Sequence, residues 1–132
     1  MRRVKPITSA ALALAAASAS AHHSIAGVYD GSRQVTVEGE VTECRFVNPH
    51  PIVVIDVAAA GGPQSWQLEM DNRFELAGIG ITADTFEPGD RVIATGSASR
   101  TDPHRLYLRR LDRPTDGLRY EQVGSRPRIA RP

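Results

Sequence analysis

The alternation of hydrophobic and polar residues in the middle of the chain predicts β-strands. The segment 34–47 alternates as far as Val41, and the apolar phase then slips by one residue to Cys44. Because a slip of one residue moves side chains to the other face of a sheet, this segment is predicted as one long strand, Gln34–Val47, with a bulge or bend near residues 39–43.

Four later segments have the length and composition of strands: 52–57, 65–70, 91–98 and 105–111. The first two flank a Gly-Gly-Pro turn and are predicted to form a hairpin. A capping Asp or Asn and a terminating glycine predict a short helix over 71–78. The order β-β-β-α-β-β predicts an all-β domain, a small five-stranded OB-like (oligonucleotide/oligosaccharide-binding type) Greek-key barrel with one short helix between strands 3 and 4. A meander sandwich is the alternative.

The first 21 residues have the pattern of a secretory signal peptide. Three basic residues precede an apolar stretch at 7–17, and an Ala-x-Ala sequence ends at Ala21. A membrane anchor is the alternative, but spanning a bilayer takes about 20 strongly apolar residues, and this stretch is shorter and mostly alanine. We therefore expect a periplasmic or secreted protein that begins at His22 and has no stable membrane insertion after cleavage.

The rest of the chain divides by composition into a folded part and a tail. The β domain is expected to cover residues 22–112. Residues 113–132 contain three prolines, scattered arginines and few large apolar side chains. This composition predicts an extended or disordered C-terminal tail.

Charge and motifs exclude two classes of function. Without residues 1–21, 13 of the 16 Lys and Arg remain against 15 Asp and Glu, so the exported chain is weakly acidic. Binding to nucleic acid through the phosphate backbone needs a concentrated basic surface, and we expect none. The chain has no G-x-S-x-G, H-E-x-x-H, P-loop or glycine-rich dinucleotide motif, so we do not expect an enzyme.

Three of the four histidines suggest a metal site. Cleavage after Ala21 would make His22 the first residue and His23 the second, so that the terminal amine and the imidazoles can chelate together. His50 lies between two prolines at a strand end and is the candidate third ligand. Nitrogen ligands of this kind suit copper(II), zinc or nickel, with copper(II) bound most tightly. The alternative is that these histidines are polar spacers and turn residues. His104 is expected to be a loop residue outside the site.

Cys44 is the only cysteine, so no internal disulfide can form. Its neighbours in the predicted strand alternate as they would around a core position. We expect Cys44 to be a small buried hydrophobic residue, with a soft metal ligand as the alternative.

Several short motifs resemble a family of short exported bacterial proteins that carries only a domain-of-unknown-function label. They are the His-His-Ser sequence after Ala21, the Asn-Pro-His turn at residues 48–50, Trp66 with Glu69, and Pro-Gly-Asp at residues 88–90. The resemblance covers roughly residues 21–112. It implies an exported small β domain and supplies no reaction.

Three functions fit these observations. The first is a non-catalytic, copper-type metal-binding accessory protein that uses His22, His23 and His50. The second is an OB-like module that binds a ligand or protein without metal, through the aromatic and arginine residues Trp66, Phe46, Tyr107, Arg45 and Arg109. The third is a structural envelope protein. The partner would accordingly be a metal ion, an acidic or sugar-like ligand, or another envelope protein.

Overall fold

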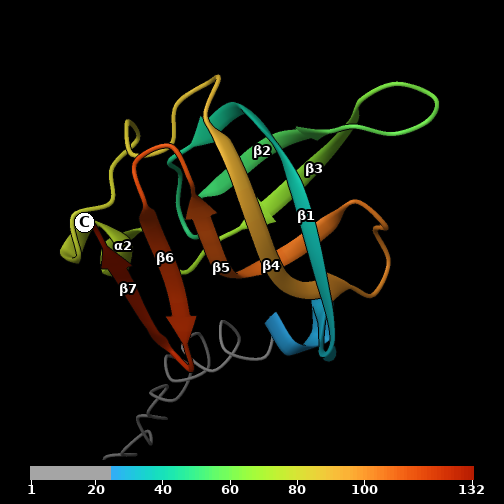
Figure 1. The fold of residues 1–132 in the computed structure, drawn as a ribbon. Coiled ribbons are helices and arrows are strands. Elements are labelled where there is room, and N and C mark those ends of the chain that lie inside the picture. Colours follow the sequence, from blue (N-terminus) through green and yellow to red (C-terminus); the bar gives the residue numbers. More distant parts are fainter. Residues whose placement is uncertain (1–24) are drawn as a thin grey trace, which may run out of the picture.

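The computed structural model describes residues 25–132, which form an all-β domain of seven strands (Figure 1). A helical turn at residues 25–28 precedes the first strand. The elements are β1 (Tyr29–Arg45), β2 (Ile52–Val57), β3 (Gln64–Glu69), α2 (Arg73–Gly78), β4 (Arg91–Ser99), β5 (Arg105–Arg113), β6 (Leu118–Val123) and β7 (Arg126–Ala130). The predicted all-β class and the short helix between the third and fourth strands are confirmed. Among the described residues, no helix is long and apolar enough to cross a membrane.

The first five strands close into a ring. The sheet order is β3-β2-β1-β4-β5-β6-β7, and a further parallel pairing joins β3 to β5. All other strand pairs are antiparallel. Strand β1 makes this closure possible because its first part pairs with β4 and its last part with β2. It therefore runs across both halves of the ring (Figure 1).

The predicted irregularity in β1 is confirmed. The register against β2 shifts between Val41 and Glu43, where the buried positions change phase from Val41 to the partly buried Cys44. Gly39 lies just before this bulge, and a Cβ there would come within 2.3 Å of the Asp56 carbonyl oxygen. The bend in the strand thus depends on a residue without a side chain.

One hydrophobic core fills the space inside the sheet. Its fully buried large side chains come from every strand except β7 and from α2 with the segment after it; they include Val41, Ile55, Leu68, Leu76, Ile81, Phe86, Val92, Leu108, Leu111 and Tyr120. Burial of apolar surface is the main force that stabilises such a fold. Asn72 caps α2, because its side-chain oxygen accepts a hydrogen bond of 2.9 Å from the Glu75 amide.

The sheet continues beyond the predicted end of the domain at residue 112. The segment 113–132, expected to be an extended or disordered tail, contains β6 and β7, so the sheet has seven strands where five were predicted. Leu118 and Tyr120 alternate inward and join the core, while the arginines of β7 point outward. The amino-acid composition of this segment did not indicate a strand, because it contains few large apolar residues. Two inward-pointing side chains are nevertheless enough to bury β6 against the core once it pairs with β5.

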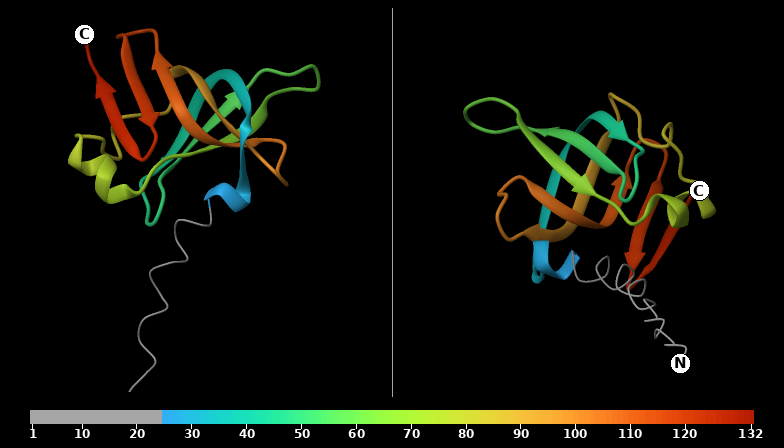
Figure 2. Two further views of the ribbon diagram at one scale, coloured as in Figure 1. Left: turned by 90° about the horizontal axis from the view of Figure 1, so that it is seen from below. Right: turned by 180° about the vertical axis from the view of Figure 1, so that it is seen from behind.

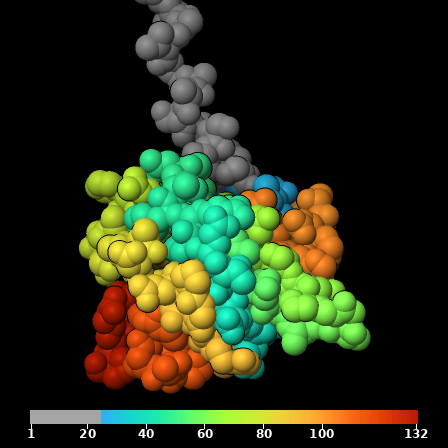
Figure 3. Space-filling view, turned by 90° about the horizontal axis from the view of Figure 1, so that it is seen from above, coloured from blue at the N-terminus to red at the C-terminus, as the bar shows by residue number. Residues whose placement is uncertain are grey.

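Two parts of the surface stand out from the body of the domain. The turn between β2 and β3 projects away from it, as the green segment in Figure 3. At the opposite side α2 lies beside the β6–β7 hairpin, which both views of Figure 2 show. This second arrangement frames the candidate site.

Candidate functional site

Strand β5 changes its neighbour halfway along, and a cleft opens there. On one edge β5 pairs with β3 as far as Tyr107 and with β6 from Arg110 onward. The cleft has a volume of about 350 Å³. We call it the His50 cleft; its lining includes Ile25, His50, Asp71, Asn72, Glu75, Tyr107, Arg109, Gln122 and Ser125. Because β3 and β6 diverge from each other along β5, polar side chains are exposed between them that a continuous sheet would cover.

His50 is oriented by the chain that follows β3. Its Nδ1 lies 3.0 Å from the Met70 carbonyl oxygen. Since a carbonyl oxygen only accepts hydrogen bonds, the hydrogen of a neutral imidazole is on Nδ1 and the lone pair is on Nε2. Backbone hydrogen bonds from Met70 to Pro51 and from Arg73 to Pro49 fix the turn on both sides of His50. Histidines that bind metals are commonly oriented in this way by a carbonyl on the second ring nitrogen.

Asp71 connects the cleft to the β6–β7 hairpin. Its carboxylate accepts hydrogen bonds of 2.7 Å from the Asn72 amide and from Gln122 Nε2. Gln122 Oε1 in turn accepts a hydrogen bond of 2.8 Å from the buried Tyr120 hydroxyl. The Asp71 carboxylate is thus buried and already hydrogen bonded, so it is a structural group of the cleft wall more than an open ligand.

A second buried network lies next to the cleft. The Tyr29 hydroxyl donates a short hydrogen bond to Glu69, and it accepts one of 2.7 Å from Arg105 Nε. Arg105 also forms an ion pair of 2.5 Å with Glu69. Burial and the hydrogen bond to Glu69 raise the pKa of Tyr29, so that its hydroxyl stays protonated. The network joins the beginnings of β1 and β5 to the end of β3, and the Tyr29 ring lies 5.7 Å from that of Tyr107.

This network was not predicted from the sequence. Glu69 at the end of a predicted strand was the only available signal, because its two partners lie 40 and 36 positions away along the chain. Tyr107 and Arg109 were predicted as part of an open aromatic face, but they line the His50 cleft.

The predicted metal ligands are only partly within the described residues. His22 and His23 lie outside residues 25–132, whereas His50 lies in the cleft. Within residues 25–132, no three His, Cys, Asp or Glu side chains are close enough together to hold a metal ion. His104, which was expected to lie outside the site, packs against Trp66 with ring centroids 5.2 Å apart.

The residues proposed for an aromatic binding face are distributed over several places. Phe46 packs under the Arg73 guanidinium at 5.3 Å, and Arg45 is paired with Glu43. Trp66 is partly buried, and its Nε1 has no hydrogen-bond partner in the described part of the chain.

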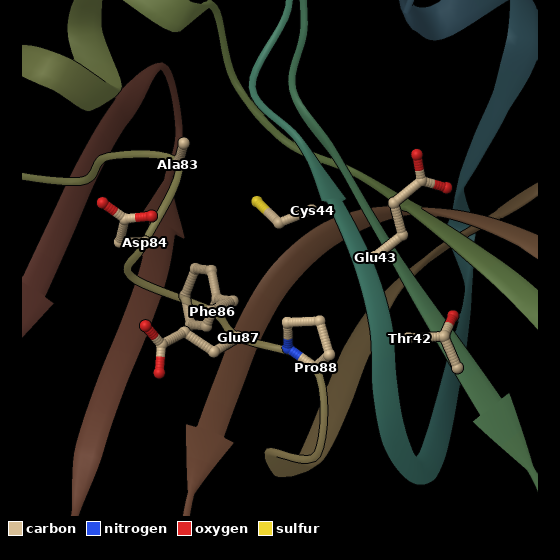
Figure 4. Close-up of a pocket in the computed structure, with 8 residues that line it drawn as sticks. All are labelled: Thr42, Glu43, Cys44, Ala83, Asp84, Phe86, Glu87 and Pro88. Carbon is tan, nitrogen blue, oxygen red and sulfur yellow. The ribbon is translucent and has the colours of Figure 1, made fainter.

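Cys44 lines a different pocket of about 480 Å³ between β1 and the loop before β4. Figure 4 shows its sulfur pointing toward Asp84 and Phe86. Cys44 is partly buried and packs against the core, close to its predicted role as a small hydrophobic residue. Burial, with smaller contributions from the charges of Asp84 and Glu43, raises the pKa of the thiol. A thiol held protonated is a poor metal ligand.

Comparison with known proteins assigns the chain to a family whose function is unknown. No curated protein and no solved structure matched the chain. A family model matches residues 10–106, well over half of the chain. The match ends within β5, so Tyr107, Arg109 and the β6–β7 hairpin follow it. On this match the chain belongs to a family of unknown function (DUF6152), as the resemblance in its motifs implied.

Proposed function

We propose that the protein is an exported, non-catalytic accessory protein that binds a copper-type divalent ion at the His50 cleft through His22, His23 and His50. The observation that carries the proposal is the position of His50. Its Nδ1 faces the Met70 carbonyl oxygen at 3.0 Å, which leaves Nε2 as the metal-binding nitrogen.

Chain connectivity supports the participation of the two N-terminal histidines. Ile25 lines the same cleft as His50, and His23 precedes it by two residues. Because consecutive Cα atoms are about 3.8 Å apart, the Cα of His23 lies within about 7.6 Å of the Cα of Ile25 in any conformation. An imidazole attached at that range can reach the mouth of the cleft.

The chemistry of the proposed ligands favours copper(II). Export would free the amine of His22, whose reference pKa of about 7.7–8 allows a metal to displace its proton near neutral pH. An amine with three imidazoles provides only nitrogen ligands, for which copper(II) outranks nickel and zinc. The site would exist only after cleavage, so the precursor would not bind the ion in this way.

A competition titration against a copper(II) chelator tests the proposal on four proteins. These are the chain that begins at His22, the same chain with one residue added before His22, His50→Ala and His104→Ala. The extension and His50→Ala should each weaken binding at least tenfold, about 1.4 kcal/mol. His104→Ala is the matched control, since His104 packs on Trp66, and it should bind as the parent does. Equal affinities in all four would mean that copper binds to surface histidines without a built site.

We also propose that the ring of β1 to β5 is an OB-like barrel with the β6–β7 hairpin added to it. The strands pair in the cyclic order β1-β2-β3-β5-β4, with β3 parallel to β5 and a helix between β3 and β4. Folds of this kind bind ligands on one face of the barrel. A ligand-binding module without metal is therefore the second candidate function, and the polar lining of the His50 cleft favours it over a purely structural envelope protein.

A further inference from the structure

Tyr107 is a mostly buried residue that lines the His50 cleft. Its exposed fraction is only 5%. Within residues 25–132 its hydroxyl makes no hydrogen bond, unlike the hydroxyls of the neighbouring Tyr29 and Tyr120. A hydroxyl at the wall of a cleft, with no hydrogen-bond partner among the described residues, is available as a donor to a ligand in the cleft.

Arg109 supplies a positive charge beside this hydroxyl. Its guanidinium lies 4.8 Å from the centroid of the Tyr107 ring, and within residues 25–132 its side chain makes a single, long hydrogen bond of 3.4 Å to the Gly124 carbonyl. No carboxylate lies within ion-pair distance of Arg109 among the described residues. By contrast, the next residue, Arg110, is paired with Asp112 at 2.6 Å.

A bulge in β5 sets the direction of Arg109. The register against β4 pairs Thr95 with Arg110 and Gly96 with Leu108, so Arg109 is the extra residue between them. Bulges bend a strand locally and redirect a side chain, and they are common next to functional sites. This one lies where β5 exchanges β3 for β6, which directs the Arg109 side chain into the cleft.

The charges around the cleft select the kind of anion. Asp71 and Glu75 also line it, so an ion with two negative charges would be repelled more strongly than one with a single charge. Burial, and then the negative charge of Asp71, raise the pKa of Tyr107 well above its usual value of 10.0. Its hydroxyl therefore remains a hydrogen-bond donor at physiological pH.

We propose that the His50 cleft binds the carboxylate group of a small organic acid, through the Arg109 guanidinium and the Tyr107 hydroxyl. A volume of about 350 Å³ suits a small molecule. Guanidinium and carboxylate match in geometry, and a phenol adds a hydrogen bond that discriminates against ligands without an acceptor at that point. This site requires no metal at His50, so it goes beyond the metal-binding function proposed above.

An NMR titration of the metal-free protein with benzoate tests the proposal. Shift changes should saturate with a Kd on the order of 1 mM and should centre on residues of the cleft. Arg109→Gln should weaken binding at least tenfold. Tyr107→Phe should weaken it about threefold, because one neutral hydrogen bond is lost. Arg110→Gln is the matched control, since Arg110 already has Asp112 as its partner, and it should bind like the wild type.

Three results would overturn the proposal: shifts that do not saturate, equal weakening by Arg109→Gln and Arg110→Gln, or inorganic phosphate binding as tightly as benzoate. The dispersion of the amide spectrum shows whether each variant is folded. If Tyr107→Phe does not fold, the comparison of the two arginine variants still decides. The chain with one residue added before His22 should bind benzoate like the wild type while it binds copper more weakly, so the two proposals fail independently.

Discussion

Leu118→Ala measures how much the β6–β7 hairpin contributes to the fold. Leu118 is 1% exposed and belongs to the core cluster, although it lies beyond the predicted end of the domain. The substitution removes about three carbon groups at roughly 0.8 kcal/mol each and leaves a cavity, so the free energy of unfolding should fall by about 3 kcal/mol. Small domains have only about 5–15 kcal/mol in total, so this loss would be severe.

Urea denaturation followed by the fluorescence of Trp66, the only tryptophan, provides the assay. With an m-value of about 1–3 kcal/mol/M, the midpoint should fall by about 1–3 M. Val123→Ala on the same strand is the control, because Val123 is 49% exposed and its truncation should change stability by less than about 0.5 kcal/mol. If Leu118→Ala were as mild as the control, the hairpin would not be part of the core.

Three further predictions concern processing, pH and packing. The exported protein should begin at His22, and an intact mass equal to that of the full precursor would contradict this. Hydrogen bonds from Arg113 lower the pKa of Asp116 from 3.8 to about 2, so this pairing stabilises the fold above about pH 4 and is lost as the pH falls toward 2. In Arg113→Gln, the NMR titration midpoint of the Asp116 carboxyl should therefore move back toward 3.8, and an unchanged midpoint would refute the pairing. Gly96→Ala should lower the free energy of unfolding by about 3 kcal/mol or more in thermal melts, because its Cβ would meet a β5 carbonyl at 2.2 Å; a normal melting temperature would show that the strands can move apart.

Local patterns in the sequence were sufficient to predict most of the individual strands and the helix. Alternating apolar residues identified the strands up to residue 111, and the phase slip after Val41 located the bulge. Asn72 marked the start of α2 through its capping side chain. These features follow from interactions between residues close together in the chain, which is why a sequence pattern reveals them.

The choice of strand partners was decided only by the tertiary structure. The parallel contact that closes the ring joins Leu68 to Leu106, and nothing near either residue specifies the other. The hairpin after residue 113 was missed for a related reason. The hairpin has few large apolar side chains, and these are buried only because β6 pairs with β5 and packs on the existing core. A prediction from composition considers the segment alone and finds too few apolar residues for it to fold.

The candidate site divides in the same way between sequence and structure. Sequence spacing picked out His50 as a residue with ligand chemistry, because a histidine between two prolines is visible without any partner. It assigned Tyr107 and Arg109 to an open face, and it did not find the network of Tyr29 and Glu69. Those roles depend on the divergence of two strands from β5 and on contacts between residues tens of positions apart. Only the folded chain brings such residues together, since burial and hydrogen bonding at a strand junction are properties of the packing and not of any local segment.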